Sequence, residues 1–219
     1  MREPLGISRR GGALHVEGYP DAVALKRIDD PIARQLKAIV LHCSDLRFCC
    51  DALAALTSLD RTSESLFAEA LWVASIARYF KCFGANKSRM PLVPTKIFAG
   101  EVGALEVFQY FRHLRDKHVI HDENAYSQSF TAVALNAQDA RFKVADVISM
   151  VITASTIDDR HIESLSHLAG HTFSWVEQKR DELHFRLGSR YEGESYAKLS
   201  SLPDVKYETP TAEKVSTGR

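Results

Sequence analysis

The chain carries no excess of charge of either sign. Its 28 lysine and arginine residues are balanced by 28 aspartate and glutamate residues in a chain of 219 residues. Proteins that coat nucleic acids regardless of sequence normally carry a basic excess, so this balance argues against that class while still allowing a small basic cleft. The length is sufficient to bury a large core without disulfides or bound metals.

Several signals of other protein classes are also missing. The cysteines Cys43, Cys49, Cys50 and Cys82 form no Cys-x-x-Cys pair, so we expect reduced thiols in a cytoplasmic protein rather than a disulfide framework. No apolar run is long enough to predict a membrane span, and we expect no signal peptide. Glycine-rich phosphate loops, Gly-x-Ser-x-Gly and zinc-deaminase motifs are missing, so nucleotide-dependent transfer, serine hydrolysis and zinc deamination have no support.

Apolar residues three or four positions apart predict two helices in the first part of the chain. The first is predicted to begin near Pro31, a residue suited to the first helical position, and to continue to about residue 58. The second is predicted over residues 66–83 and ended by Gly84. It is apolar on nearly every side, a pattern typical of a helix in the middle of a bundle.

The rest of the chain predicts two further helices separated by a hairpin. A third helix is predicted from Thr95 to about His118. The alternation and turn residues of 129–148 predict a β-hairpin with its turn at Asn136 to Asp139, although a helix over 139–154 is an alternative. A long last helix is predicted from Asp158 to about residue 187.

These elements predict a mainly α fold, a helical bundle of four main helices with a small β-hairpin inserted before the last long helix. We expect three regions along the chain. Residues 1–28 form an irregular or partly strand-like lead-in, residues 29–187 form the helical domain, and residues 188–219 form an irregular or disordered tail.

Positive and ionisable groups are concentrated where the third helix is predicted to end. The stretch contains Arg112, Arg115, Lys117, His118 and His121. A guanidinium can hold two phosphate oxygens at once. An imidazole can accept a proton from a ribose 2′-hydroxyl or return one to a leaving oxygen. These are the minimum groups for metal-free RNA cleavage.

Helix geometry restricts which of these groups can meet. On a straight α-helix Arg115 and His121 lie about 120° apart, so they do not share a face. They can meet if the helix ends before His121 and the chain bends back, or if two subunits each supply groups to one site. A continuous helix would instead bring His118 near Arg115, three positions earlier, while Arg112 and His118 form a rival pair for the same role.

The segment Arg115–His121 reads Arg-Asp-Lys-His-Val-Ile-His and resembles the signature of HEPN domains, an arginine, a polar residue and then a histidine after four to six intervening positions. Together with residues 71–83 and 114–118 it is similar to the abortive-infection branch of that family, and the resemblance covers about residues 29–187. HEPN domains are helical bundles that commonly dimerise with the motif at the interface. Many are metal-independent endoribonucleases of toxin–antitoxin, abortive-infection and CRISPR-linked defence systems.

The resemblance implies a role for each motif residue. Arg115 would bind the scissile phosphate and stabilise its developing charge, and His121 would act as general base or acid. Asp116, where most family members have asparagine, would orient one of them. We assign substrate binding to Arg112, Lys117 and His118. The resemblance implies no cofactor and no metal, RNA rather than DNA as substrate, a homodimer, and an antitoxin or defence protein as partner.

Two alternatives lead away from an enzyme. A non-catalytic HEPN-like module would bind a nucleotide or a partner protein, and zero net charge and Asp116 favour it slightly. A helical scaffold would use the same charges only to stabilise the end of the third helix. On the last helix His167 and His171 have a spacing that can bind zinc, but no accompanying motif is present, so we expect a surface or interface pair.

Overall fold

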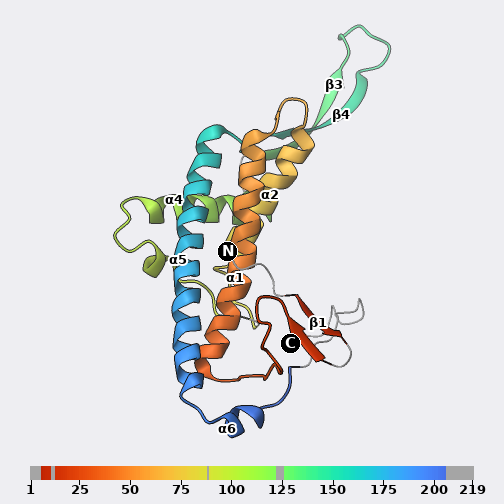
Figure 1. Cartoon of the computed structure of the whole chain (residues 1–219). Helices are drawn as coiled ribbons and strands as arrows, with labels where there is room; N and C mark the ends of the chain where they lie inside the picture. The colour runs from red at the N-terminus through yellow and green to blue at the C-terminus, as the bar shows by residue number, and fades with distance from the viewer. Residues whose placement is uncertain (1–5, 11–12, 88, 122–125, 206–219) are drawn as a thin grey trace. The chain divides into compact units, whose positions relative to one another are not determined.

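The fold is mainly helical, with a small antiparallel hairpin before the last long helix (Figure 1). A computed structural model describes residues 6–10, 13–87, 89–121 and 126–205. The chain divides into two compact units, the first formed by residues 1–38 and 179–219 and the second by residues 39–178. The predicted fold class is confirmed, and each unit is described separately below.

The first unit contains both ends of the chain. A hairpin of β1 (Ile7–Arg10) and β2 (Ala13–Val16) forms the strand-like part of the lead-in. At the other end, α5 (Asp159–Glu192) continues past residue 187 and is followed by α6 (Tyr196–Ser200). Part of the predicted irregular tail is therefore helical; residues 206–219 lie outside the described residues.

An acidic side chain caps the start of α1 (Pro31–Ser58). The amide of Ala33 donates to the Asp30 carboxylate at 2.8 Å, which satisfies one of the free N–H groups of the first turn. The Tyr191 hydroxyl, near the end of α5, donates to the same carboxylate at 2.8 Å. Asp30 therefore joins the beginning of α1 to the end of α5 within the first unit.

The second unit is built around α2 (Ser65–Lys81). Segments of α1, α2, α4 and α5 bury a shared core whose largest members are Leu46, Leu53, Trp72, Ile76, Tyr79, Phe80, Phe108, Phe111 and Leu165. The polar atoms of Trp72 and Tyr79 are satisfied: the Trp72 indole donates to the Thr156 hydroxyl at 3.0 Å, and the Tyr79 and Thr172 hydroxyls lie 3.1 Å apart. Leu66 and Phe67 remain exposed. The sequence predicts a helix buried on nearly every side, and α2 is buried on fewer sides than that.

The predicted continuous third helix is wrong. The structure has a short α3 (Pro94–Ile97), then α4 (Ala104–Leu114), then a π-helical turn η1 (Arg115–Val119). Between α3 and α4, Gly100 and Gly103 adopt φ values of 86° and 79°. This left-handed conformation is strained for residues with a Cβ, and it cannot continue a right-handed helix.

The predicted hairpin is confirmed, with longer strands and a longer connection. β3 (Ser127–Leu135) pairs antiparallel with β4 (Val144–Thr153), with Phe130 opposite Met150. Asn136 closes the connection, because its backbone amide donates to the Lys143 carbonyl at 3.0 Å. The alternative helix over 139–154 is not formed. No helix in the described part of the chain is both long and apolar enough to cross a membrane.

Candidate functional site

The predicted motif begins in the π-helical turn η1. The amide of Ile120 donates to the Arg115 carbonyl at 3.0 Å, an i to i+5 hydrogen bond that widens the last turn. Short π-helical segments of this kind occur frequently at functional sites. Regular helix ends at Val119, two residues before His121.

Two contacts hold the Arg115 side chain in place. Its guanidinium carbon lies 5.6 Å from the centre of the buried Phe80 ring of α2, within the range of a cation–π interaction. Its Nε donates to Asp116 Oδ1 at 2.7 Å, and its Nη2 pairs with the same oxygen. The other Asp116 oxygen lies 4.0 Å from Arg112 Nε. Asp116 therefore brings two of the predicted arginines together.

The predicted histidines lie in different environments. The His118 ring is half-buried and packs against Tyr126, with 5.4 Å between the ring centres. Its Nδ1 is shielded from solvent and makes no hydrogen bond to the residues that the structure describes. His121 is exposed, and within the described ranges no polar contact joins it to Arg115. Lys117 is exposed beside them.

A second polar network lies next to the motif and was not foreseen from the sequence. The Tyr110 hydroxyl on α4 is 2.9 Å from Nε2 of His161 on α5, and Asp158 lies 2.8 Å from the other ring nitrogen of His161. Burial raises the pKa of Tyr110, and the charge of Tyr126 and a hydrogen bond with it act in the same direction. Since Tyr126 also contacts His118, the network reaches from the start of α5 to η1.

No sequence signal could have identified this network. Tyr110 and His161 are 51 residues apart and match no motif. Their contact depends on how α4 packs against α5, which periodicity does not predict. Asp158 also accepts from the His161 amide at 2.7 Å, so the same carboxylate caps α5 and lies beside the imidazole.

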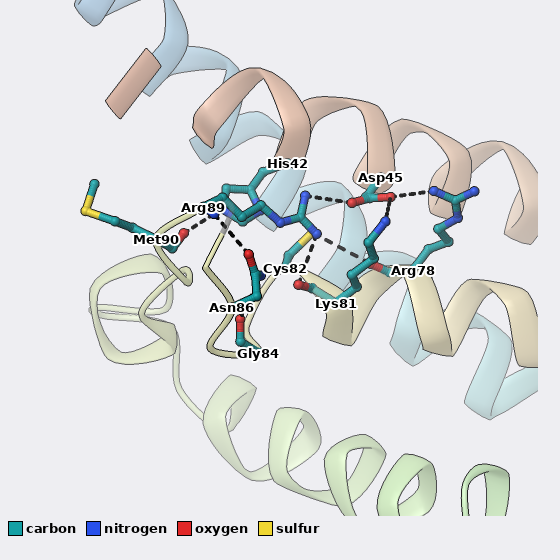
Figure 2. A network of polar contacts seen from close by, with 9 residues as sticks. All are labelled: His42, Asp45, Arg78, Lys81, Cys82, Gly84, Asn86, Arg89 and Met90. Atoms are coloured by element: carbon teal, nitrogen blue, oxygen red, sulfur yellow. Dashed lines mark hydrogen bonds and ion pairs between the residues drawn. The ribbon is translucent and has the colours of Figure 1, made fainter. Parts of the chain in front are cut away.

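The most buried charge cluster of the second unit surrounds Asp45 on α1 (Figure 2). The carboxylate is 3% exposed and is held by Arg78 at 2.6 Å, by Arg89 at 2.7 Å and by Lys81 at 3.3 Å. Burial opposes ionisation of Asp45, but the hydrogen bonds from Arg78 and Arg89 and the nearby charges outweigh it and lower its pKa. Lys81 and Arg89 therefore form structural ion pairs with Asp45.

The same cluster fixes the loop that follows α2. Arg89 is buried, and its Nη2 donates to the Lys81 carbonyl at 3.1 Å (Figure 2). Next to it, Nε2 of His42 lies 2.9 Å from the Met90 carbonyl. Burial lowers the pKa of His42, partly opposed by this hydrogen bond. These contacts hold the loop against α1 and α2.

The thiols and the paired histidines show no arrangement suited to catalysis or metal binding. Burial raises the pKa of Cys49 and raises that of Cys82 to about 12, so both are protonated thiols. His171 stacks on Phe98 and its Nε2 lies 3.0 Å from the Ile97 carbonyl, a packing role. Within the described ranges no three His, Cys, Asp or Glu side chains are grouped so that they could hold a metal ion.

Comparisons of the chain with models of protein families, with curated proteins and with solved structures found no match. The resemblance to HEPN domains consequently rests on the motif residues and on their surroundings in the sequence.

Proposed function

We propose that the protein is a HEPN-type, metal-independent endoribonuclease of a toxin–antitoxin or phage-defence system. One observation carries the proposal. The Arg115 guanidinium is held between Phe80 and Asp116, and the π-helical turn ends two residues before the exposed His121. A held guanidinium and an accessible imidazole are the two kinds of group that cleavage of a phosphodiester by its own 2′-hydroxyl requires.

Arg115 can bind phosphate without leaving Asp116. A guanidinium has five N–H donors, and the contacts with Asp116 use only Nε and Nη2. The remaining donors would bind the non-bridging oxygens and stabilise the charge that develops on them. Holding Arg115 rigid lowers the ordering cost at the moment of reaction.

The chemistry needs one proton acceptor and one proton donor. The 2′-oxygen attacks phosphorus as its proton passes to an imidazole, and the bond to the 5′-oxygen breaks as that oxygen receives a proton. The products are a 2′,3′-cyclic phosphate and a 5′-hydroxyl. We assign one of these roles to His121. A second copy of the motif across a homodimer, or His118 next to Tyr126, would supply the other.

The proposal is tested by incubating the purified protein with labelled RNA in EDTA. We expect cleavage by wild type and a loss of at least about 100-fold in Arg115→Ala and in His121→Ala. Arg186→Ala and His184→Ala, exposed positions on α5, are matched controls that should cleave normally. Loss of cleavage in His118→Ala but not in His121→Ala would transfer the role to the rival histidine. Full activity in both motif variants would contradict the proposal.

The second candidate is a non-catalytic module that binds a nucleotide or a partner protein. Its supporting observation is Asp116, whose carboxylate already pairs with Arg115 and approaches Arg112. A phosphate at this position meets a negative charge as well as two positive ones. Asp116→Asn separates the two candidates. The enzyme predicts RNA cleavage at least equal to that of wild type in this variant, whereas the module predicts tighter nucleotide binding and no cleavage.

A further inference from the structure

A series of contacts leads from the start of α5 to His118 in the π-helical turn η1. Nδ1 of His161 lies 2.8 Å from Asp158 Oδ2, and its Nε2 lies 2.9 Å from the Tyr110 hydroxyl. Tyr110 is hydrogen-bonded to Tyr126, whose ring packs on His118. All five residues belong to the second compact unit. We call Asp158, His161, Tyr110 and Tyr126 the support network.

The carboxylate of Asp158 sets the direction of the hydrogen bonds in the support network. At 2.8 Å from Nδ1 of His161 it favours a proton on that nitrogen, which leaves Nε2 as an acceptor. Tyr110 then donates its single hydroxyl proton to Nε2 and accepts from the Tyr126 hydroxyl. Burial raises the pKa of Tyr110, so its phenol stays protonated near neutral pH. Loss of the Tyr110 hydroxyl would therefore break the network in the middle.

Tyr126 is held both by its backbone and by its side chain. Its carbonyl accepts from the Ala154 amide at 2.8 Å, next to the base of the hairpin of β3 and β4. Its side chain is hydrogen-bonded to Tyr110. A side chain whose orientation is fixed by such supporting contacts can hold a neighbouring reactive group in one geometry. The group that the Tyr126 ring contacts is the imidazole of His118, with 5.4 Å between the ring centres.

The surroundings of His118 suit a group that gives a proton to the substrate. Its Nδ1 is shielded and makes no hydrogen bond to any residue in the described ranges, so Nε2 is the nitrogen that a substrate can reach. A cation is attracted to an aromatic ring within about 6 Å, and the Tyr126 ring lies inside that distance of the imidazole. His121, exposed and two residues beyond η1, remains for the opposite role.

We propose that His118 is the general acid of the cleavage reaction and that the support network positions it. The inference rests on the proposed endoribonuclease function. His121 accepts the proton of the 2′-hydroxyl as the bond from the 2′-oxygen to phosphorus forms. His118 gives its Nε2 proton to the 5′-oxygen as the bond from that oxygen to phosphorus breaks. Both proton-transfer groups then come from one chain, and the residues of the support network act on the reaction only through His118.

Proton donation by His118 is tested with an RNA that carries sulfur in place of the 5′-oxygen at the mapped cleavage site. A thiol loses its proton near about pH 8.5, so the sulfur leaves as a thiolate without receiving a proton. On ordinary RNA we expect His118→Ala to lower kcat at least about 100-fold and Tyr110→Phe about tenfold, with KM changed less than about twofold. On the sulfur RNA both losses should disappear, whereas the loss in Arg115→Ala should remain.

The positioning role is tested by NMR without RNA. We expect contacts between the ring protons of His118 and Tyr126 in wild type. These contacts should weaken in Tyr110→Phe and in His161→Phe, because the Tyr126 ring is no longer held. The matched control is Tyr196→Phe, which removes the same hydroxyl at a position 76% exposed and should leave both the ring contacts and kcat unchanged. Circular dichroism identifies any variant that fails to fold.

The outcomes separate this inference from the function on which it rests. Restored cleavage of the sulfur RNA by His118→Ala and Tyr110→Phe, with weakened ring contacts in the folded network variants, supports it. If Arg115→Ala is inactive but His118→Ala cleaves normally, or gains nothing from the sulfur RNA, the acid role is overturned and the endoribonuclease remains. Ring contacts that persist in Tyr110→Phe overturn the positioning role, whether or not RNA is cleaved. A wild type that cleaves no RNA overturns the proposed function and the acid role with it.

Discussion

At the scale of single residues, Asp45 is the side chain whose loss should affect the fold most. It is the carboxylate partner of Arg89, and both side chains are buried. Asp45→Ala would leave the Arg89 guanidinium buried without its partner, which typically costs about 3–5 kcal/mol. Urea denaturation should show this loss in the free energy of unfolding. Asp51→Ala, an exposed position on the same helix, should change it by less than about 0.5 kcal/mol.

The lowered pKa of Asp45 gives this contribution a defined pH dependence. A carboxyl whose pKa is lower in the folded state stabilises the protein above its unfolded value, near 3.9, and the contribution is lost as pH falls towards the folded pKa. The stability difference between wild type and Asp45→Asn should therefore be constant from pH 7 to 5 and shrink below about pH 4. A difference that grew on acidification would contradict the assignment of Asp45 as the ionised partner.

His42 should act in a different pH window. Because burial lowers its pKa, the folded protein favours the neutral imidazole, and the stabilisation is complete only above the unfolded value near 6.5. Below that pH the free energy of unfolding should fall by up to about 1.4 kcal/mol per pH unit until the folded pKa is reached. An NMR titration should place the His42 pKa below 6.5. His42→Asn should show a shallower loss of stability between pH 7 and 5.5.

At the scale of elements, replacing each of two glycines by alanine should change the stability of the protein in opposite directions. Gly103 caps α4 at φ 79°, whereas Gly170 lies inside α5, and a Cβ at either position would meet no atom within 4 Å. Gly103→Ala should therefore destabilise the protein by about 1 kcal/mol through backbone strain alone. Gly170→Ala should stabilise it by about 0.5–1 kcal/mol because alanine favours the helix. Thermal denaturation of the two variants should show a melting temperature below that of wild type for Gly103→Ala and above it for Gly170→Ala.

Some of the helices and strands could be predicted from the local sequence, and others could not. Pro31 and the apolar spacing after it predict α1 within a residue or two, and alternation predicts the hairpin. The break at Gly100 could not be predicted, because an isolated glycine is compatible with a helix and only its tertiary setting selects φ 86°. The π-helical turn has no sequence signature either, since it differs from an α-helix by one shifted hydrogen bond.

In the candidate site, too, contacts between neighbours in the sequence could be predicted, whereas contacts between distant helices could not. The pairing of Arg115 with Asp116 is local, and the sequence predicts both as site residues. The contact of Arg115 with Phe80, and that of Tyr110 with His161, require α2, α4 and α5 to be packed. Contacts between residues far apart in the chain depend on how the helices pack. Periodicity predicts which face of a helix is buried, but it does not predict which residues meet there.

At the scale of the whole molecule, the two ends of the described chain meet in the first unit. The amide of Arg27 donates to the Pro203 carbonyl at 2.7 Å, and the amide of Val205 donates to the Leu25 carbonyl at 3.0 Å. Lys26 and Asp204 form an ion pair at 2.8 Å between them. The segment after α6 is consequently part of the folded structure as far as Val205, although the sequence predicts an irregular tail from residue 188.

Shortening the chain should reveal this pairing. A chain that ends at Leu202 lacks the acceptor for Arg27 and the partner of Lys26, whereas a chain that ends at Val205 keeps both. We expect the Arg27 amide to exchange with solvent at least about tenfold faster in the shorter chain only, because its hydrogen bond is gone. Amides of α2 serve as the internal reference and should exchange equally in both. Equal exchange of Arg27 in the two chains would show that the pairing with residues 203–205 contributes nothing to the order of this segment.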